Sequence, residues 1–304
     1  MSHPGTAHIY APSLLAFEHT PHPSAQPTNT LLFIGGLGDG LLTIPYPRHI
    51  AAALPPTWSL CEVLLSSSYT GWGVGSLARD AMELGECVAY FKQRRGGGKV
   101  VIMGHSTGCQ DIMEYLVGEG KEGRPRVEGV VMQGGVSDRE AWGDYVAREG
   151  GRGAFDNVVE MARRMVGEGR GGDVMPSREN VVMQELGAPM SAQRTLALLD
   201  KGGADDYFSS DLEDGVLEGT FGRIPGETVV CFLLGGEDPY VPRSVDKEAL
   251  MGRWAEVVRR GGGRVDGVNG GVVEGAHHNL DGDPEEVVQE LVRRVCGFLG
   301  GLGA

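Results

Sequence analysis

A serine between two glycines has the surroundings that most clearly indicate covalent chemistry in this sequence. Residues 104–108 read GHSTG; they follow an apolar, β-branched run at 100–103 and precede apolar residues at helical spacing. A strand, a G-x-S-x-G turn and a helix in this order form a nucleophile elbow, a strained turn that exposes the serine hydroxyl. We therefore predict that Ser106 is a nucleophile and that the neighbouring His105 packs under the turn.

A serine hydroxyl needs a base to take its proton, and a carboxylate that orients the base. On α/β-hydrolase folds the order along the chain is nucleophile, acid, histidine. Asp238 follows the apolar run 228–234 in a turn of glycines and proline, and His278 follows the last predicted strand. We predict these two as acid and base. His277 remains the alternative base, and Asp138, after the run 126–133, the alternative acid.

The negative oxygen of a tetrahedral intermediate needs fixed hydrogen-bond donors. The backbone N–H of Thr107, directly after the serine, is one candidate. The second is expected from the loop after the strand predicted at 30–34, where Leu37 follows two glycines. The same loop resembles part of a dinucleotide-binding fingerprint, but it lacks the third glycine at the required offset and an immediate helix.

These residues need a scaffold of alternating strands and helices. Strands are predicted at 30–34, 59–66, 99–103, 126–133, 228–234 and 264–273, with an edge strand at 8–19. Helices are predicted at 48–54, 77–91, 107–117 and 244–260, and in a final segment with Asp283 as its N-cap. This alternation is typical of an α/β-hydrolase fold, a mostly parallel sheet with helices on both faces.

The alternation stops over residues 137–226, which are helical and polar, with helices predicted at 139–148, 154–166 and 190–199. We interpret this segment as an inserted helical cap on a core formed by residues 1–136 and 227–304. It contains four aspartates, for which a solvated loop is the expected state and a cation site the alternative: Asp205, Asp206, Asp211 and Asp214.

Composition excludes several classes of function. The net charge of −14 over 304 residues disfavours nucleic acid as a partner, because phosphate binding requires a positive surface. The N-terminal residues do not read as a secretory signal, and no apolar run approaches the roughly 20 residues of a membrane helix. Five scattered cysteines favour a reduced compartment, which predicts a cytoplasmic protein without membrane contact.

No metal or other cofactor is predicted, because no cysteine or histidine spacing suggests zinc. Four histidines near the N-terminus could suggest a metal tract, but prolines separate them and they are expected to be solvated loop residues: His3, His8, His19 and His22.

Longer motifs resemble one family. The stretches at 104–111 (GHSTGCQD), 33–37 (FIGGL), 39–43 (DGLLT), 136–140 (VSDRE) and 205–212 (DDYFSSDL) are similar to the fungal α/β-hydrolase family of SidJ-type fusarinine siderophore esterases. The resemblance implies an intracellular serine hydrolase that opens hydroxamate siderophore esters after uptake. Its partner would be a small-molecule ester, including a ferric siderophore. It also implies Ser106 as nucleophile, Asp238 as acid and His278 as base.

Other functions remain open on the same residues. A general carboxylesterase, a thioesterase or a lipid esterase would use the same triad. A non-enzymatic binding protein on this fold is the third alternative, and a complete set of triad residues argues against it.

Overall fold

The computed structural model describes residues 2–20, 26–148 and 152–302. Its strands form one sheet in the order β1-β2-β4-β3-β5-β6-β7-β8, and β9 also pairs with β7. The pairings from β4 onwards are parallel, whereas β1–β2 and β2–β4 are antiparallel. The strand bounds are β1 Gly5–Ala11, β2 Leu14–His19, β3 Asn29–Ile34, β4 Trp58–Val63, β5 Val100–His105, β6 Gly129–Gln133, β7 Val229–Gly235, β8 Arg264–Val265 and β9 Gly271–Val273.

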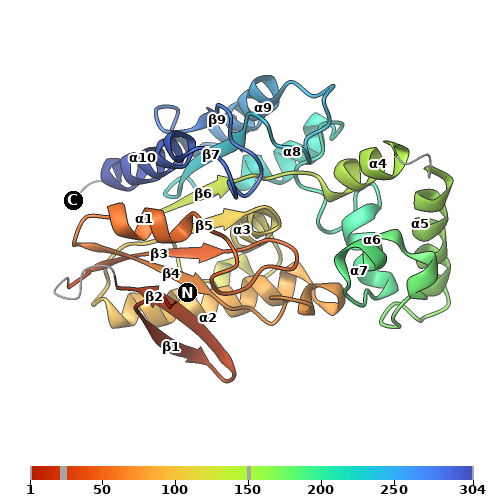
Figure 1. The fold of residues 1–304 in the computed structure, drawn as a ribbon, viewed down its shortest axis with the longest axis horizontal. Coiled ribbons are helices and arrows are strands. Elements are labelled where there is room, and N and C mark those ends of the chain that lie inside the picture. The colour runs from red at the N-terminus through yellow and green to blue at the C-terminus, as the bar shows by residue number, and fades with distance from the viewer. Residues whose placement is uncertain (1, 21–25, 149–151, 303–304) are drawn as a thin grey trace.

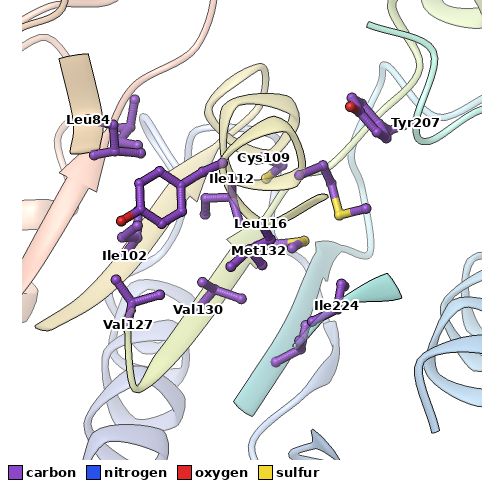
Figure 2. Packing of buried hydrophobic residues seen from close by; sticks show 14 of the residues in the cluster. Leu84, Ile102, Cys109, Ile112, Leu116, Val127, Val130, Met132, Tyr207 and Ile224 are labelled. Carbon is purple, nitrogen blue, oxygen red and sulfur yellow. The ribbon is translucent and has the colours of Figure 1, made fainter. Parts of the chain in front are cut away.

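Helices cover both faces of the sheet (Figure 1). On one face, α1 (Pro47–Ala53) and α10 (Glu285–Gly301) belong to the same apolar cluster as Val101 and Met103 of β5. On the other, α2 (Leu77–Arg94), α3 (Gly108–Val117) and α9 (Lys247–Arg260) belong to the same apolar cluster as Val100 and Ile102. Figure 2 shows part of this second layer, where side chains of α3 meet those of β5 and β6. Successive strand residues thus point to opposite faces, and both faces are apolar, as buried parallel strands require.

A long helical segment connects β6 to β7 (green to cyan in Figure 1). Its helices are α4 Asp138–Arg148, α5 Arg152–Gly167, α6 Val181–Leu186, α7 Ala192–Leu199 and α8 Asp214–Gly219. The sequence pattern predicts α4, α5 and α7 but misses the short α6 and α8. Side chains of α5, α6 and α7 share a separate apolar cluster, whereas Phe208, Leu217 and Phe221 join the core that covers the sheet.

Two predicted strands are each wrong in one respect. The edge strand predicted at 8–19 is the hairpin β1–β2, because Pro12 and Ser13 form a turn in which Ser13 has a φ of 65°. The strand predicted at 264–273 is interrupted between β8 and β9. There the Asp266 carboxylate accepts hydrogen bonds from the backbone N–H groups of Val268 and Asn269, which holds a turn instead of an extended chain.

Two polar predictions near the chain ends are also corrected. His8 and His19 are buried in the hairpin, where their ring nitrogens lie 2.8 Å from Glu18 and 2.7 Å from Glu62. The predicted loop histidine His22 lies outside the described residues. The N-cap of α10 is Pro284 and not Asp283, which binds another residue described below. In the described ranges, no helix has the length and apolar character needed to span a bilayer.

Candidate active site

Ser106 occupies a strained turn between β5 and α3. Its φ is 54°, in a region that side chains other than glycine rarely adopt. The turn closes tightly: a Cβ atom on Gly104 would lie 2.3 Å from the carbonyl oxygen of Gly108, and one on Gly108 would lie 2.6 Å from that of Ile34. The N–H of Ser106 donates to the carbonyl of Gln133 at 3.0 Å. The glycines around Ser106 are therefore required by space, as the elbow motif predicts.

Asp238 and His278 form a hydrogen-bonded pair at the carboxyl ends of neighbouring strands. Asp238 lies in the turn after β7 and His278 in the loop after β9, and Nδ1 of His278 is 2.7 Å from Oδ2 of Asp238. The backbone N–H of Tyr240 donates to the other carboxylate oxygen at 3.0 Å. Burial by itself would raise the pKa of Asp238, but the His278 ring and the Tyr240 N–H hold it below its usual value. The carboxylate is thus ionised and faces a ring nitrogen.

The His278 ring lies beside the serine turn. A Cβ atom on Gly134, which has a φ of +67°, would be 3.1 Å from Cε1 of His278 and 3.8 Å from the backbone nitrogen of Ser106. The ring centroid of His278 is also 4.7 Å from that of the buried His105. Ser106 and His278 line one cavity. The structure therefore brings Ser106, Asp238 and His278 together.

The two alternative residues are engaged elsewhere. Nδ1 of His277 is 2.6 Å from Oδ1 of Asp283, and the His277 side chain is 58% exposed. Asp138 accepts a hydrogen bond from the amide nitrogen of Gln110 at 3.0 Å. Both residues line the cavity, but neither takes part in the Asp238–His278 pair.

The loop after β3 lies against the serine. A Cβ atom on Gly36 would lie 2.6 Å from Cβ and 3.1 Å from Oγ of Ser106. The Asp39 carboxylate accepts from the Gly36 N–H at 2.8 Å and so folds the loop back on itself. Leu37, the next residue, lines the same cavity as Ser106. Thr107 is the N-cap residue of α3, where backbone N–H groups lack partners within the helix. Both predicted oxyanion residues thus adjoin Ser106.

The cavity beside Ser106 has a volume of about 610 Å³ and a mixed lining. Aromatic side chains come from α4 and from the turn after β7, and acidic and basic side chains come from the loop after β3, from α4 and from α6. They are Trp142, Tyr145 and Tyr240, and Asp39, Asp138, Arg148 and Glu185. The sequence pattern does not identify these residues as a group; its only signal is a pair of aromatic residues one helical turn apart in the helix predicted at 139–148.

All four aspartates of the 205–214 region pair with a cation. The expected exposure to solvent is correct for Asp211 and Asp214, whose side chains are 44% and 68% exposed, and wrong for Asp205 and Asp206, whose side chains are buried. Asp205 binds the buried Arg194, Asp206 and Asp211 bind Arg139, and Asp214 binds Arg253. Across the part of the chain that the structure describes, no group of three or more histidine, cysteine, aspartate or glutamate side chains could hold a metal ion.

The mostly parallel sheet, with a strained serine turn after β5 and an Asp–His pair after β7 and β9, defines an α/β-hydrolase. The chain belongs to the family described as "protein of unknown function (DUF1749)", whose model matches residues 1–300. This membership and the relatives below confirm the fold class and the family resemblance expected from the motifs.

Two curated relatives are named as esterases. The chain is 36% identical to fusarinine C esterase sidJ of Aspergillus fumigatus, over 98% of this chain and 96% of the relative. It is 37% identical to an esterase of Emericella nidulans, over 97% and 92%. Among solved structures, siderophore hydrolase EstB from Aspergillus fumigatus matches with a TM-score of 0.84 and 34% identity, over 99% and 98% of the two chains. The protein is accordingly an ester hydrolase.

Proposed function

We propose that the protein cleaves the ester bonds of fusarinine-type hydroxamate siderophores in the cytoplasm, with Ser106 as nucleophile, His278 as general base and Asp238 as its carboxylate partner. The observation that carries the proposal is the 2.7 Å contact between His278 Nδ1 and Asp238 Oδ2 beside the strained Ser106 turn. An ionised carboxylate at Nδ1 favours the tautomer that leaves Nε2 free to accept a proton.

The reaction begins when Nε2 of His278 takes the proton of Ser106 and the serine Oγ attacks the ester carbonyl carbon. The carbonyl oxygen becomes negative, and the backbone N–H groups of Thr107 and Leu37 stabilise it. The intermediate then loses its alcohol, which receives the proton from His278, and an acyl group remains on Ser106. Water, deprotonated by His278, releases the carboxylic acid and restores the serine.

Two features support a siderophore as substrate. Relatives that align with nearly the whole chain are named as a fusarinine C esterase and a siderophore hydrolase. The cavity combines aromatic, acidic and basic side chains in about 610 Å³, whereas an enzyme specific for long acyl chains would be expected to present a narrow apolar tunnel. Hydrolysis of the esters would separate the hydroxamate monomers and so help to release ferric iron.

The state of the cysteines supports a cytoplasmic location. All five cysteines are free thiols, and four of them are buried among apolar side chains. This usage is typical of proteins in reducing compartments.

The test is to incubate the protein with ferric and iron-free fusarinine C and to detect monomer by mass spectrometry. Monomer should form with the wild type and not with Ser106→Ala, which should also fail to react with a fluorophosphonate probe. Cleavage of short activated esters without any cleavage of fusarinine C would show a general carboxylesterase. Rates that rise with acyl length would show a lipid esterase. A folded Ser106→Ala variant with wild-type activity would disprove the triad.

A further inference from the structure

Gln133 is a buried polar residue at the end of an otherwise apolar strand. It is the last residue of β6 and is 2% exposed. In the sheet register its partners are His105 on β5 and Leu233 on β7. Ser106 directly follows the first partner, and Asp238 lies in the turn beyond the second. Gln133 therefore lies between the proposed nucleophile and the acid–base pair.

Gln133 contacts both sides of the proposed triad. Its backbone carbonyl accepts the N–H of Ser106 at 3.0 Å, which holds the serine turn. Its side-chain amide nitrogen donates to the backbone carbonyl of His278 at 3.0 Å. Gln133 thus binds the backbone of Ser106 through its own backbone carbonyl, and it binds the backbone of His278 through its side-chain amide.

The hydrogen bonds around the amide fix its orientation. The carbonyl of His278 can only accept, so the amide nitrogen of Gln133 must face it. The amide oxygen then accepts from the hydroxyl of Tyr46 at 2.8 Å and from Nδ1 of His105 at 2.6 Å. His105 must therefore carry its proton on Nδ1. Burial, together with the nearby His278, lowers the pKa of His105 to about 3, so this ring stays neutral near pH 7.

The loop that carries His278 depends on such contacts. Residues 274–284 form neither strand nor helix, and the loop is fastened next to His278 by the N–H of Glu237, which donates to the carbonyl of Ala276 at 3.0 Å. At His278 itself, Asp238 holds the ring and Gln133 holds the backbone. Without the Gln133 amide, the ring could still bind Asp238 while its other nitrogen moved relative to Ser106.

We infer that Gln133 is a positioning residue that sets the placement of His278 relative to Ser106 through the backbone carbonyl of His278. The inference rests on the proposed function, because it takes His278 as the base. A general base must lie within hydrogen-bonding reach of the proton it removes, and a displacement of about 1 Å can cost on the order of 100-fold in rate.

The first test compares two buried glutamines. Gln133→Met keeps the length of the side chain and removes its hydrogen bonds; we expect kcat to fall about 30-fold or more with KM within about threefold. Gln110→Met is the matched control. Gln110 is also buried, and its amide nitrogen donates to a backbone carbonyl, that of Val136, at 3.1 Å. The Gln110→Met variant should lose about as much thermal stability as Gln133→Met, while its kcat stays within about threefold of wild type.

The second test uses pH to separate positioning from mere structural damage. In Gln133→Glu the protonated carboxyl can still donate to the carbonyl of His278, whereas the ionised form cannot. The ratio of its kcat to that of wild type should therefore be highest at low pH and fall as pH rises, while the ratio for Gln133→Met stays constant. Circular dichroism at each pH establishes that both variants are folded.

The groups around the carboxyl of the Gln133→Glu variant allow its pH dependence to be assigned to that carboxyl. Titratable side chains face it from the residue before α1 (Tyr46), β5 (His105), α3 (Cys109) and the loop that carries His278, with Asp238 beyond. Burial raises the pKa values of Tyr46 and Cys109 well above their usual ranges, so both stay neutral between pH 5 and pH 9. Groups common to both proteins affect both kcat values and largely cancel in the ratio.

A Gln133→Met variant with wild-type kcat, or a Gln133→Glu ratio that does not change with pH, would overturn the inference; if one variant does not fold, the other decides. Ser106→Ala, assayed in parallel, tests the proposed function separately. If Ser106→Ala is inactive and Gln133→Met is fully active, only the positioning role fails. If Ser106→Ala is active, the triad itself is wrong.

Discussion

Asp283 accepts two hydrogen bonds from His277, one from its backbone N–H at 2.8 Å and one from its ring Nδ1 at 2.6 Å. Two adjacent histidines thus bind two different aspartates, since His278 binds Asp238. The sequence alone favours His278 as the base by loop spacing. The structure adds a physical distinction: the His278 pair is buried beside Ser106, and His277 is largely exposed.

The two Asp–His pairs permit a matched comparison. We expect Asp238→Asn to lower kcat about 10³- to 10⁴-fold with little change in KM, because the amide no longer stabilises the protonated ring or fixes its tautomer. Asp283→Asn makes the same change in the neighbouring pair and should leave kcat within about threefold of wild type. Steady-state kinetics on a short activated ester measures both. Equal losses in the two variants would contradict the assignment.

Gly36 should tolerate no side chain. A Cβ atom there would lie 2.6 Å from Cβ of Ser106, so Gly36→Ala must displace either the serine turn or the loop that carries Leu37. We expect kcat/KM to fall about 100-fold, with a smaller effect on the melting temperature. Gly123→Ala is the control, because a Cβ atom at Gly123 meets nothing within 4 Å. Wild-type activity in Gly36→Ala would remove the case for this loop as an oxyanion donor.

A buried ion pair secures the helical segment between β6 and β7. Nη1 of Arg194 lies 2.7 Å from both carboxylate oxygens of Asp205, and both side chains are almost fully buried. Asp205→Asn leaves the guanidinium buried without a full countercharge, and we expect the free energy of unfolding to fall by about 3–5 kcal/mol.

The surface pair Arg163–Asp200 is the control for this measurement. Arg163 is well exposed, and Asp200→Asn should change urea unfolding very little, because water and salt screen such pairs. A small effect of Asp205→Asn, similar to that of Asp200→Asn, would mean that the buried pair contributes little.

Asp138 should make stability depend on pH. Burial, and next the charge of Asp205, raise its pKa from 3.8 to about 7. The folded state therefore binds this proton more tightly than the unfolded state. The resulting stabilisation is complete below about pH 4 and is lost as pH rises towards about 7.

Asp138→Asn mimics the protonated acid at every pH. We expect its melting temperature relative to wild type to rise by about 4 °C between pH 4 and pH 8. Asp214→Asn is the control of opposite sign, because its hydrogen bond to Arg253 lowers the pKa of Asp214. Because the pKa of Asp214 lies below 3.8, the difference for Asp214→Asn should change little between pH 4 and pH 8 and should shift only below about pH 4. Differential scanning fluorimetry from pH 3 to pH 8 tests both, and a constant difference for Asp138→Asn would rule out the raised pKa.

Much of the fold follows from patterns that are local in the sequence. Apolar β-branched runs predict the parallel strands, and Ser76 caps α2 as its position suggests, by accepting the N–H of Arg79. The glycines around Ser106 have a local steric cause, so the turn is also predictable. The acid and the base could be proposed because the order of the triad residues along the chain is known for this fold. Only the structure separates them from the alternatives His277 and Asp138.

The rest depends on which segments meet in space. The sequence predicts His8 and His19 in solvent, but a hairpin places their side chains against Glu18 and Glu62. Asp283 has the position of a helix cap, yet it binds His277 instead. In the sequence, Gln133 stands out only as a polar residue at the end of an apolar strand. Its role depends on contact with the loop that carries His278, which lies far along the chain.

The strands β6 and β7 lie side by side in register, from the Gly129–Val229 pair to the Gln133–Leu233 pair, although α4 to α8 separate them in sequence. The connection from β6 to β7 therefore leaves and re-enters the sheet at neighbouring strands. Its length can change without changing how these strands pair. The connection contributes α4 and α6 to the lining of the cavity beside Ser106. Substitutions in these two helices can therefore alter the shape and charge of the cavity without disturbing the strand ends that carry Ser106, Asp238 and His278.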